Sequence, residues 1–267
     1  MLRRLGAGQL RLPDQRWRRI HGAGSTQDRV TRGSLAAPAQ KYSVFKGDTI
    51  NRSDAKGRKQ GVWKRYYAND TLFSEGQYKD GKAIGTFRTF YKNGKQQAIM
   101  TYRGMTERCD AIVYAEAGHL MAKGVYQSQK KDSVWCYFSE QGKLQSLEQY
   151  QKGKKEGKWE VFYPEGNPSQ TLFYKADKKN GIYKEFFKNG KTKIEGVMKN
   201  DAFEGKVTVY HPSGKVWQQG VYKNGVKDGK WIVLDEAGKT EREEIYKSGF
   251  LLNPVAEPET PIAEPEK

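Results

Sequence analysis

The sequence predicts an all-β fold, an elongated antiparallel β-hairpin repeat array made of eight 24-residue repeats. The first observation is a fixed period. Rows of 24 residues start at residues 61, 85, 109, 133, 157, 181, 205 and 229 without an insertion or deletion. Such a period is typical of stacked supersecondary units. The second is a pair of turn signals in each row, and the third is the lack of any 3.6-residue apolar stripe.

Three columns of the repeat recur from row to row. The third column is aromatic in six rows: Trp63, Phe87, Trp135, Trp159, Tyr183 and Trp231. A glycine marks the first turn in seven rows: Gly94, Gly118, Gly142, Gly166, Gly190, Gly214 and Gly238. A tyrosine stands near the row end in seven rows: Tyr78, Tyr102, Tyr126, Tyr150, Tyr174, Tyr222 and Tyr246. The third row, residues 109–132, deviates most, and a looser hairpin is expected there.

Each row is predicted to be one β-hairpin, because its two apolar runs are separated by dipeptides such as Asn93-Gly94. If these two residues form a type I′ turn, Phe87 lies opposite Met100. The same register sets Trp63 opposite Gly76 and Tyr78 opposite Gly61. An aromatic ring laid over a bare glycine makes that glycine tolerable in a strand, so this pairing explains the pattern.

Alternation along the strands predicts two faces. The Trp face, expected to be buried, carries Gly61, Trp63, Tyr67, Leu72, Ser74, Gly76 and Tyr78. The outer face carries the aromatic line, our candidate partner-binding residues: Tyr66, Phe90, Tyr114, Phe138, Phe162, Phe186 and Tyr210. It also carries the basic line, our candidate residues for an anionic surface: Lys79, Arg103, Lys175, Lys199, Lys223 and Lys247. A second set of lysines follows the hairpin glycine in five rows: Lys95, Lys143, Lys191, Lys215 and Lys239. Two strands per repeat would space these rungs by about 9.6 Å.

The repeats, residues 61–250, are flanked by segments of different composition. Residues 1–40 hold eight arginines and no lysine, and are predicted to be a disordered leader. This leader is a non-structural or wrongly assigned start, an organelle transit peptide, or a basic interaction arm; it lacks the apolar run of a signal peptide. Residues 41–60 are expected to form a capping strand, and residues 251–267 a solvated Pro/Glu-rich tail. The sequence does not identify the cellular compartment; if the start is wrongly assigned, the protein could be exported.

Charge suggests partners without naming one. The chain has a net charge of +17, and the repeats themselves are basic. Lysine ladders beside an aromatic line would suit an anionic membrane surface, an acidic polymer or an acidic protein. The alternative is that these lysines only solvate the sheet and prevent edge pairing. Nucleic acid is disfavoured because no DNA or RNA module is recognisable.

Catalysis is not predicted. His21, His119 and His211 fall in separate parts of the chain, and no triad, metal-binding spacing or phosphate loop is present. We therefore expect no enzyme activity, metal or cofactor. The only cysteines, Cys109 and Cys136, lie in consecutive repeats about 9.6 Å apart, which is beyond disulfide reach. No apolar run is long enough for a transmembrane helix.

The row pattern resembles the MORN-repeat variant family, bacterial proteins labelled as YwqK-type antitoxins of toxin–antitoxin systems. The resemblance rests on Gly-x-Trp-x-x-Tyr/Phe-Tyr, the Asn-Gly turn and Gly-x-Tyr-x-x-Gly, as in residues 61–81 and 205–225. It implies a β-repeat binding scaffold with protein or phospholipid partners. Two functions are therefore weighed: a non-catalytic scaffold for protein–protein interaction, including an antitoxin, and peripheral binding to anionic surfaces. The partner and the oligomeric state stay open.

Overall fold

The computed structural model describes residues 40–45 and 47–252, and strands are its only regular secondary structure. The strands are β1 (Lys41–Phe45), β2 (Asp48–Ser53), β3 (Lys59–Tyr66), β4 (Leu72–Lys79), β5 (Lys82–Phe90), β6 (Gln96–Tyr102), β7 (Arg108–Tyr114), β8 (Leu120–Gln127), β9 (Lys130–Phe138), β10 (Leu144–Gln151), β11 (Lys154–Phe162), β12 (Pro168–Lys175), β13 (Lys178–Phe186), β14 (Thr192–Lys199), β15 (Ala202–Phe203), β16 (Gly205–Tyr210), β17 (Val216–Lys223), β18 (Val226–Leu234), β19 (Thr240–Lys247) and β20 (Phe250–Leu251). The predicted fold class is confirmed.

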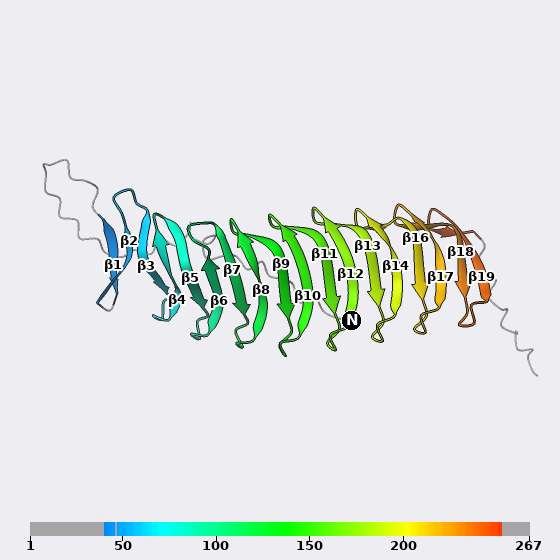
Figure 1. Cartoon of the computed structure of the whole chain (residues 1–267), viewed down its shortest axis with the longest axis horizontal. Coiled ribbons are helices and arrows are strands. Elements are labelled where there is room, and N and C mark those ends of the chain that lie inside the picture. Colours follow the sequence, from blue (N-terminus) through cyan, green and yellow to red (C-terminus); the bar gives the residue numbers. More distant parts are fainter. Residues whose placement is uncertain (1–39, 46, 253–267) are drawn as a thin grey trace, which may run out of the picture.

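All twenty strands belong to one open antiparallel sheet in which each strand pairs with its neighbour in the chain. β15 and β16 share the place of a single strand, because both pair with β14. Figure 1 shows the strands side by side in chain order, with loops along both long edges of the sheet. One edge carries the hairpin tips within the repeats, and the other carries the turns that join one repeat to the next.

The predicted register within the hairpins is confirmed, but the predicted tip turn is wrong. Phe87 lies opposite Met100 and Trp63 opposite Gly76. Asn93 does not adopt the positive φ that a type I′ turn needs; Gly94 does, at 80°. The loop is one residue longer, because the Tyr91 amide donates to the Lys95 carbonyl (2.9 Å). A bulge then follows on β6, which restores the register.

The turns between repeats, rather than the hairpin tips, adopt the two-residue form. Asn224 and Gly225 have φ values of 52° and 83°, and Lys223 pairs with Val226 across them. Both central residues are therefore left-handed, as a type I′ turn requires. Ala176 and Asp177 form the same turn without a glycine, at φ 49° and 73°.

Rings do stack over glycines, as predicted, but the glycines are covered by other rings than those predicted. A Cβ built on Gly76 would lie 2.2 Å from the ring of Phe87 in the next repeat, and one on Gly124 would lie 2.3 Å from the ring of Trp135. Each ring thus covers the glycine eleven residues earlier, and the atoms nearest a Cβ on Gly76 belong to Phe87, not to Trp63 across the hairpin. Tyr78 does not cover Gly61, because a Cβ on Gly61 would meet nothing within 4 Å.

The tryptophan side chain adds a hydrogen bond to the same preceding repeat. The indole Nε1 of Trp135 donates to the Val125 carbonyl (3.0 Å), and that of Trp159 donates to the Gln149 carbonyl (2.9 Å). Trp231 does the same with the Val221 carbonyl (3.1 Å). Each acceptor lies ten residues earlier, next to the position where glycine recurs. The indole N–H therefore joins adjacent repeats, whereas the ring also contacts the tyrosine of its own hairpin, as Trp159 does Tyr174 at 4.7 Å between centroids.

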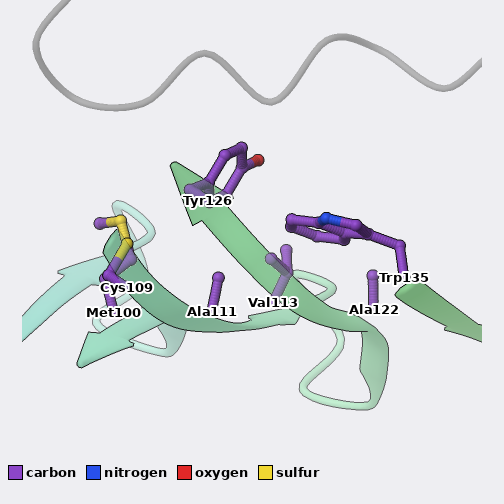
Figure 2. Packing of buried hydrophobic residues seen from close by; sticks show 7 residues of the cluster. All are labelled: Met100, Cys109, Ala111, Val113, Ala122, Tyr126 and Trp135. Carbon is purple, nitrogen blue, oxygen red and sulfur yellow. The ribbon is translucent and has the colours of Figure 1, made fainter. Parts of the chain in front are cut away.

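The Trp face is the buried face, as predicted, and one buried cluster on it spans the third repeat and the start of the fourth. Ala111, Val113 and Tyr126 of the third repeat and Trp135 of the fourth are buried in it and lie on the same side of the strands (Figure 2). The rings of Tyr126 and Trp135 meet edge to face, 4.8 Å apart. The expectation of a loose third hairpin is wrong, because small and β-branched side chains fill the space that a central tryptophan occupies elsewhere.

The two ends of the sheet differ from the predicted boundaries. The N-terminal cap contains two paired strands, β1 and β2, rather than one, and β2 pairs with β3 at Arg52 and Ser53. At the other end β20 extends to Leu251, which pairs with Tyr246. The predicted leader up to residue 39 and the predicted tail from residue 253 lie outside the described residues.

Candidate binding surface

The aromatic line lies at the ends of the first strand of each repeat, next to the hairpin tips. The bulge on the second strand sets an apolar side chain opposite most of its members: Tyr66 lies opposite Leu72, Tyr114 opposite Leu120, and Phe138 opposite Leu144. Residues opposite each other in a sheet share a face. The assignment of Leu72 to the Trp face is therefore wrong, because the bulge shifts it to the outer face.

All seven members of the aromatic line are half-buried, and three have a side-chain partner. Tyr66 stacks on Phe45, with ring centroids 4.0 Å apart. The Lys123 ammonium lies 5.6 Å from the Phe138 ring centroid. The Tyr210 hydroxyl donates to Glu195 Oε1 (2.6 Å), and burial, followed by this bond to a carboxylate, raises the pKa of Tyr210 to about 12.

The tyrosine that follows several line residues, which the sequence analysis named without a binding role, holds the line in place. The Tyr67 hydroxyl donates to the Phe90 carbonyl, Tyr91 to that of Tyr114, and Tyr163 to that of Phe186, at 2.7–2.8 Å. Each bond joins a hairpin tip to the line residue of the next repeat. The signal was present, because each of these tyrosines directly follows a member of the line.

The basic line lies along the opposite edge, beside the turns between repeats. Its lysines are exposed, and two of the five face a second lysine across the turn: Lys79 lies opposite Lys82, and Lys175 opposite Lys178. Like charges placed opposite each other are destabilising. Arg103 differs from the other members, because it forms a bidentate ion pair with Asp110 (3.0 Å).

Three acidic side chains along this edge bind backbone amides rather than the exposed lysines, while Asp80 and Asp132 pair with arginines. Asp177 accepts from the Lys155 amide (2.8 Å), Asp201 from the Lys179 amide (2.8 Å), and Glu156 from the Ala176 amide (2.8 Å). Within the described ranges no ion pair involves Lys79, Lys175 or the other lysines of the basic line. The exposed lysines of the basic line are therefore not neutralised by direct ion pairs with described residues.

The lysines that follow the hairpin glycine, at the hairpin tips, do more than solvate the sheet or offer charge to a partner. Lys95 donates through Nζ to the Ala117 carbonyl (3.2 Å), and Lys215 to the Glu236 carbonyl (2.7 Å). Lys191 makes the same contact with the Ser213 carbonyl. These three ammonium groups are used to join neighbouring hairpin tips.

The Trp face contains a third set of lysines, which the sequence analysis missed. The ammonium of Lys155 lies 4.5 Å from the Trp159 ring centroid, and that of Lys227 lies 4.3 Å from that of Trp231. Lys59, Lys131 and Lys179 lie over rings in the same way. Cation–π contacts of this kind stabilise a fold by about 0.5–1 kcal/mol each. The spacing Lys-x-x-x-Trp in the sequence was the available signal.

Groups with catalytic or metal-binding potential lie apart from one another. No group of three or more His, Cys, Asp and Glu side chains that could hold a metal ion occurs among the residues described. His211 Nε2 lies 3.0 Å from the Leu234 carbonyl, in the position that tyrosine occupies at other tips. Cys109 and Cys136 are free thiols, and burial raises the pKa of Cys109 to about 11. In the part of the chain described, no helix could cross a membrane.

The family model described as MORN repeat variant matches residues 59–80, 155–176, 179–200 and 203–224. Four of the eight repeats are thus similar to MORN repeat variants. The matched stretches each begin two residues before a row, so they have the same period as the structural repeat. MORN repeats are repeat modules used in binding. No curated protein matches the chain.

Comparison with solved structures gives weak likenesses. A mutant Photorhabdus luminescens Tc holotoxin pore matches at 11% identity and a TM-score of 0.20 over 76% of this chain. TcdB2-TccC3 matches at 10% identity and a TM-score of 0.21 over 74% of this chain. The chain spans 13% and 15% of the length of those chains. Likenesses this weak bear on neither fold nor function.

Proposed function

We propose that this chain is a non-catalytic scaffold that binds a protein partner along the aromatic line of its outer face. The observation that carries the proposal is the repetition of a half-buried ring at one position of every hairpin from Tyr66 to Tyr210, with an apolar residue opposite it in five of the seven. Aromatic side chains are enriched at protein interfaces, and tyrosines are frequent among the few residues that carry most of the binding energy. Rungs about 9.6 Å apart would present them to an extended partner surface.

Replacing Phe90, Phe162 and Phe186 together by alanine tests the proposal. These three rings are chosen because Tyr66, Phe138 and Tyr210 contact other side chains. The triple variant is expected to lose binding to a partner isolated with the wild-type chain by at least tenfold, measured by calorimetry. Circular dichroism checks that the sheet persists.

The matched control replaces Val134, Ile182 and Val197 by alanine. These side chains are exposed on the same face but lie outside the aromatic line. The control should bind as the wild type does. Equal losses in both variants, or full binding by the aromatic variant, would show that the line is not the site.

An antitoxin would be a special case of this scaffold. It requires a toxic protein partner whose effect on growth is relieved by co-expression of this chain. The Phe90, Phe162 and Phe186 variant should fail to relieve that effect, and the Val134, Ile182 and Val197 variant should relieve it. Relief by both variants would remove the aromatic line from such a role.

Peripheral binding to an anionic surface is the second candidate, and the basic line supports it. The lysine pairs Lys79–Lys82 and Lys175–Lys178 hold like charges opposite each other, while nearby carboxylates are occupied by backbone amides. An anionic surface would relieve this repulsion. Each lysine near an anionic bilayer contributes about 1 kcal/mol of binding free energy, and salt screens the attraction.

The test is co-sedimentation with vesicles of phosphatidylcholine containing phosphatidylserine. Lys175→Glu with Lys178→Glu is expected to weaken binding, whereas the equally charged control Lys143→Glu with Lys239→Glu, at the tip edge, should weaken it less. Binding of the wild type should fall steeply with salt. Binding that ignores salt, or equal losses in the two variants, would exclude the basic line as a membrane site.

A further inference from the structure

Both ends of the sheet carry large apolar side chains that are exposed to solvent. At the C-terminal end, Phe250 and Leu252 are 76% and 58% exposed. At the N-terminal end, Tyr42 and Val44 on β1 are 63% and 62% exposed. Large apolar side chains grouped at an open sheet end mark a contact surface or an aggregation risk.

The two ends also differ in shape. The N-terminal hairpin and the first repeat border an open hollow of about 620 Å³. Its lining includes Val44, Phe45, Ile50, Trp63 and Tyr66. The C-terminal end instead carries the short strand β20, in which Phe250 and Leu251 project beyond the last full repeat. One end thus has a recess and the other has a projection.

Charge distinguishes the ends in the same way. Residues 40–58 hold five basic and two acidic side chains, whereas residues 235–252 hold three basic and five acidic ones. The C-terminal end is therefore acidic within a chain of net charge +17. Opposite potentials steer association and fix orientation. Two like ends would repel each other, and two unlike ends would attract.

We propose that copies of this chain associate end to end, with Phe250 and Leu252 of one copy packed into the hollow at the N-terminal end of the next. The contact is heterologous, so it joins different surfaces of the two copies and leaves a free end at each terminus of the assembly. Chains of more than two copies would form at high concentration. This inference is independent of the partner proposed for the aromatic line.

The experiment uses two variants that each block one end of the full-length chain. Phe250→Asp places a carboxylate on the projecting end, and Val44→Asp places one at the rim of the hollow. In sedimentation velocity, the wild type should show a sedimentation coefficient that rises with concentration and falls with added salt. Each variant alone should stay monomeric, because each lacks one half of the contact.

Mixing the two variants gives the decisive result. The Val44→Asp chain retains an intact C-terminal end and the Phe250→Asp chain an intact hollow, so an equimolar mixture should form a heterodimer and nothing larger. Ile182→Asp, at an exposed apolar position (53%) in the middle of the array, should associate as the wild type does. Circular dichroism confirms the fold of all three.

Three outcomes would overturn the proposal. A wild type that stays monomeric at all concentrations would show that the ends do not meet. Self-association of Val44→Asp but not of Phe250→Asp would indicate a symmetric contact between two C-terminal ends. A mixture that fails to form the heterodimer would show that the two surfaces do not fit each other.

Discussion

Gly124 shows why glycine recurs at one position of these repeats. Its φ is not left-handed, so backbone conformation does not demand a glycine there. A Cβ would instead overlap the ring of Trp135 at 2.3 Å. The glycine therefore exists to admit the ring of the next repeat, and Gly220 does the same for Trp231.

Substituting these glycines gives a graded test of close packing. Gly124→Ala is expected to lower the free energy of unfolding by about 1–3 kcal/mol, because the Trp135 ring must move. Gly196→Ala is the matched control, since the nearest atom there is Val207 Cγ2 at 2.8 Å, and its loss should be smaller. Urea denaturation measures both. A smaller loss at Gly124 than at Gly196 would contradict the proposed contact.

Glu244 is a buried carboxylate in the last repeat. Burial opposes its ionisation, but hydrogen bonds from Arg242 and Tyr246 and the charge of Lys227 outweigh burial, so the pKa of Glu244 lies below its usual value of 4.5. A lowered pKa means that its contribution to stability is present above about pH 4.5 and is lost as the pH falls through the folded-state pKa.

Glu244→Gln should therefore destabilise the chain most at neutral pH, by about 2 kcal/mol, the size expected for hydrogen bonds to a charged group. The difference in unfolding free energy between wild type and variant should shrink as the pH drops from 7 to 3. Thermal or urea denaturation over this range measures it. A difference that stays constant with pH would show that the carboxylate is not stabilised by these partners.

Neighbouring hairpins are joined to each other at their tips. A tyrosine at each of several tips donates to the backbone of the next hairpin, as Tyr91 does to Tyr114 (2.8 Å). Burial, followed by the charge of Glu116, raises the pKa of Tyr67 and Tyr91, so these hydroxyls stay protonated donors. Phe187 occupies the same position without a hydroxyl, so the tip of that repeat lacks this bond.

Tyr91→Phe removes one such bond while keeping the ring. We expect a loss of about 1 kcal/mol in unfolding free energy and faster amide hydrogen exchange at the tip of residues 91–95. Phe187→Tyr is the reverse change and should slow exchange at residues 187–191. Unchanged exchange in both variants would show that the hydroxyl does not stabilise the tips.

The whole molecule follows from its period. Because each repeat contacts only its neighbours, the stability of an array is close to a sum of repeat and interface contributions. Deleting residues 157–180 removes one complete 24-residue repeat and should leave a folded, less stable array with a smaller urea m-value. Deleting residues 157–168 removes only half a repeat and should prevent cooperative folding, because it breaks strand pairing. Equal behaviour of the two deletions would contradict the repeat boundaries.

Much of the fold could be predicted from the sequence because period and turn chemistry are local signals. The register of Trp63 against Gly76 followed from counting alone. Two compensating irregularities, the longer tip loop at Gly94 and the bulge after it, left that register unchanged and so could not be detected by counting. The bulge also places Leu72 on the outer face, opposite Tyr66 of the aromatic line.

The packing between repeats was harder to predict. Pairing rules describe which backbone positions are opposite each other, but they do not say over which strand a ring leans. Phe87 covers Gly76 because its ring reaches back to the preceding strand. The lysines over the Trp face, such as Lys155 over Trp159, were missed for the same reason. Which residues of the outer face bind a partner stays a prediction, because side-chain exposure alone does not identify the partner.

The central claim is that the ring over a strand glycine comes from the next repeat rather than from the opposite strand of the same hairpin. The most direct measurement is a nuclear Overhauser spectrum of the full chain. We predict strong contacts between the Trp135 indole and the Gly124 Hα atoms, between Phe87 and Gly76, and upfield ring-current shifts of both glycines. Strong contacts from Trp63 to Gly76, with none from Phe87, would contradict the account.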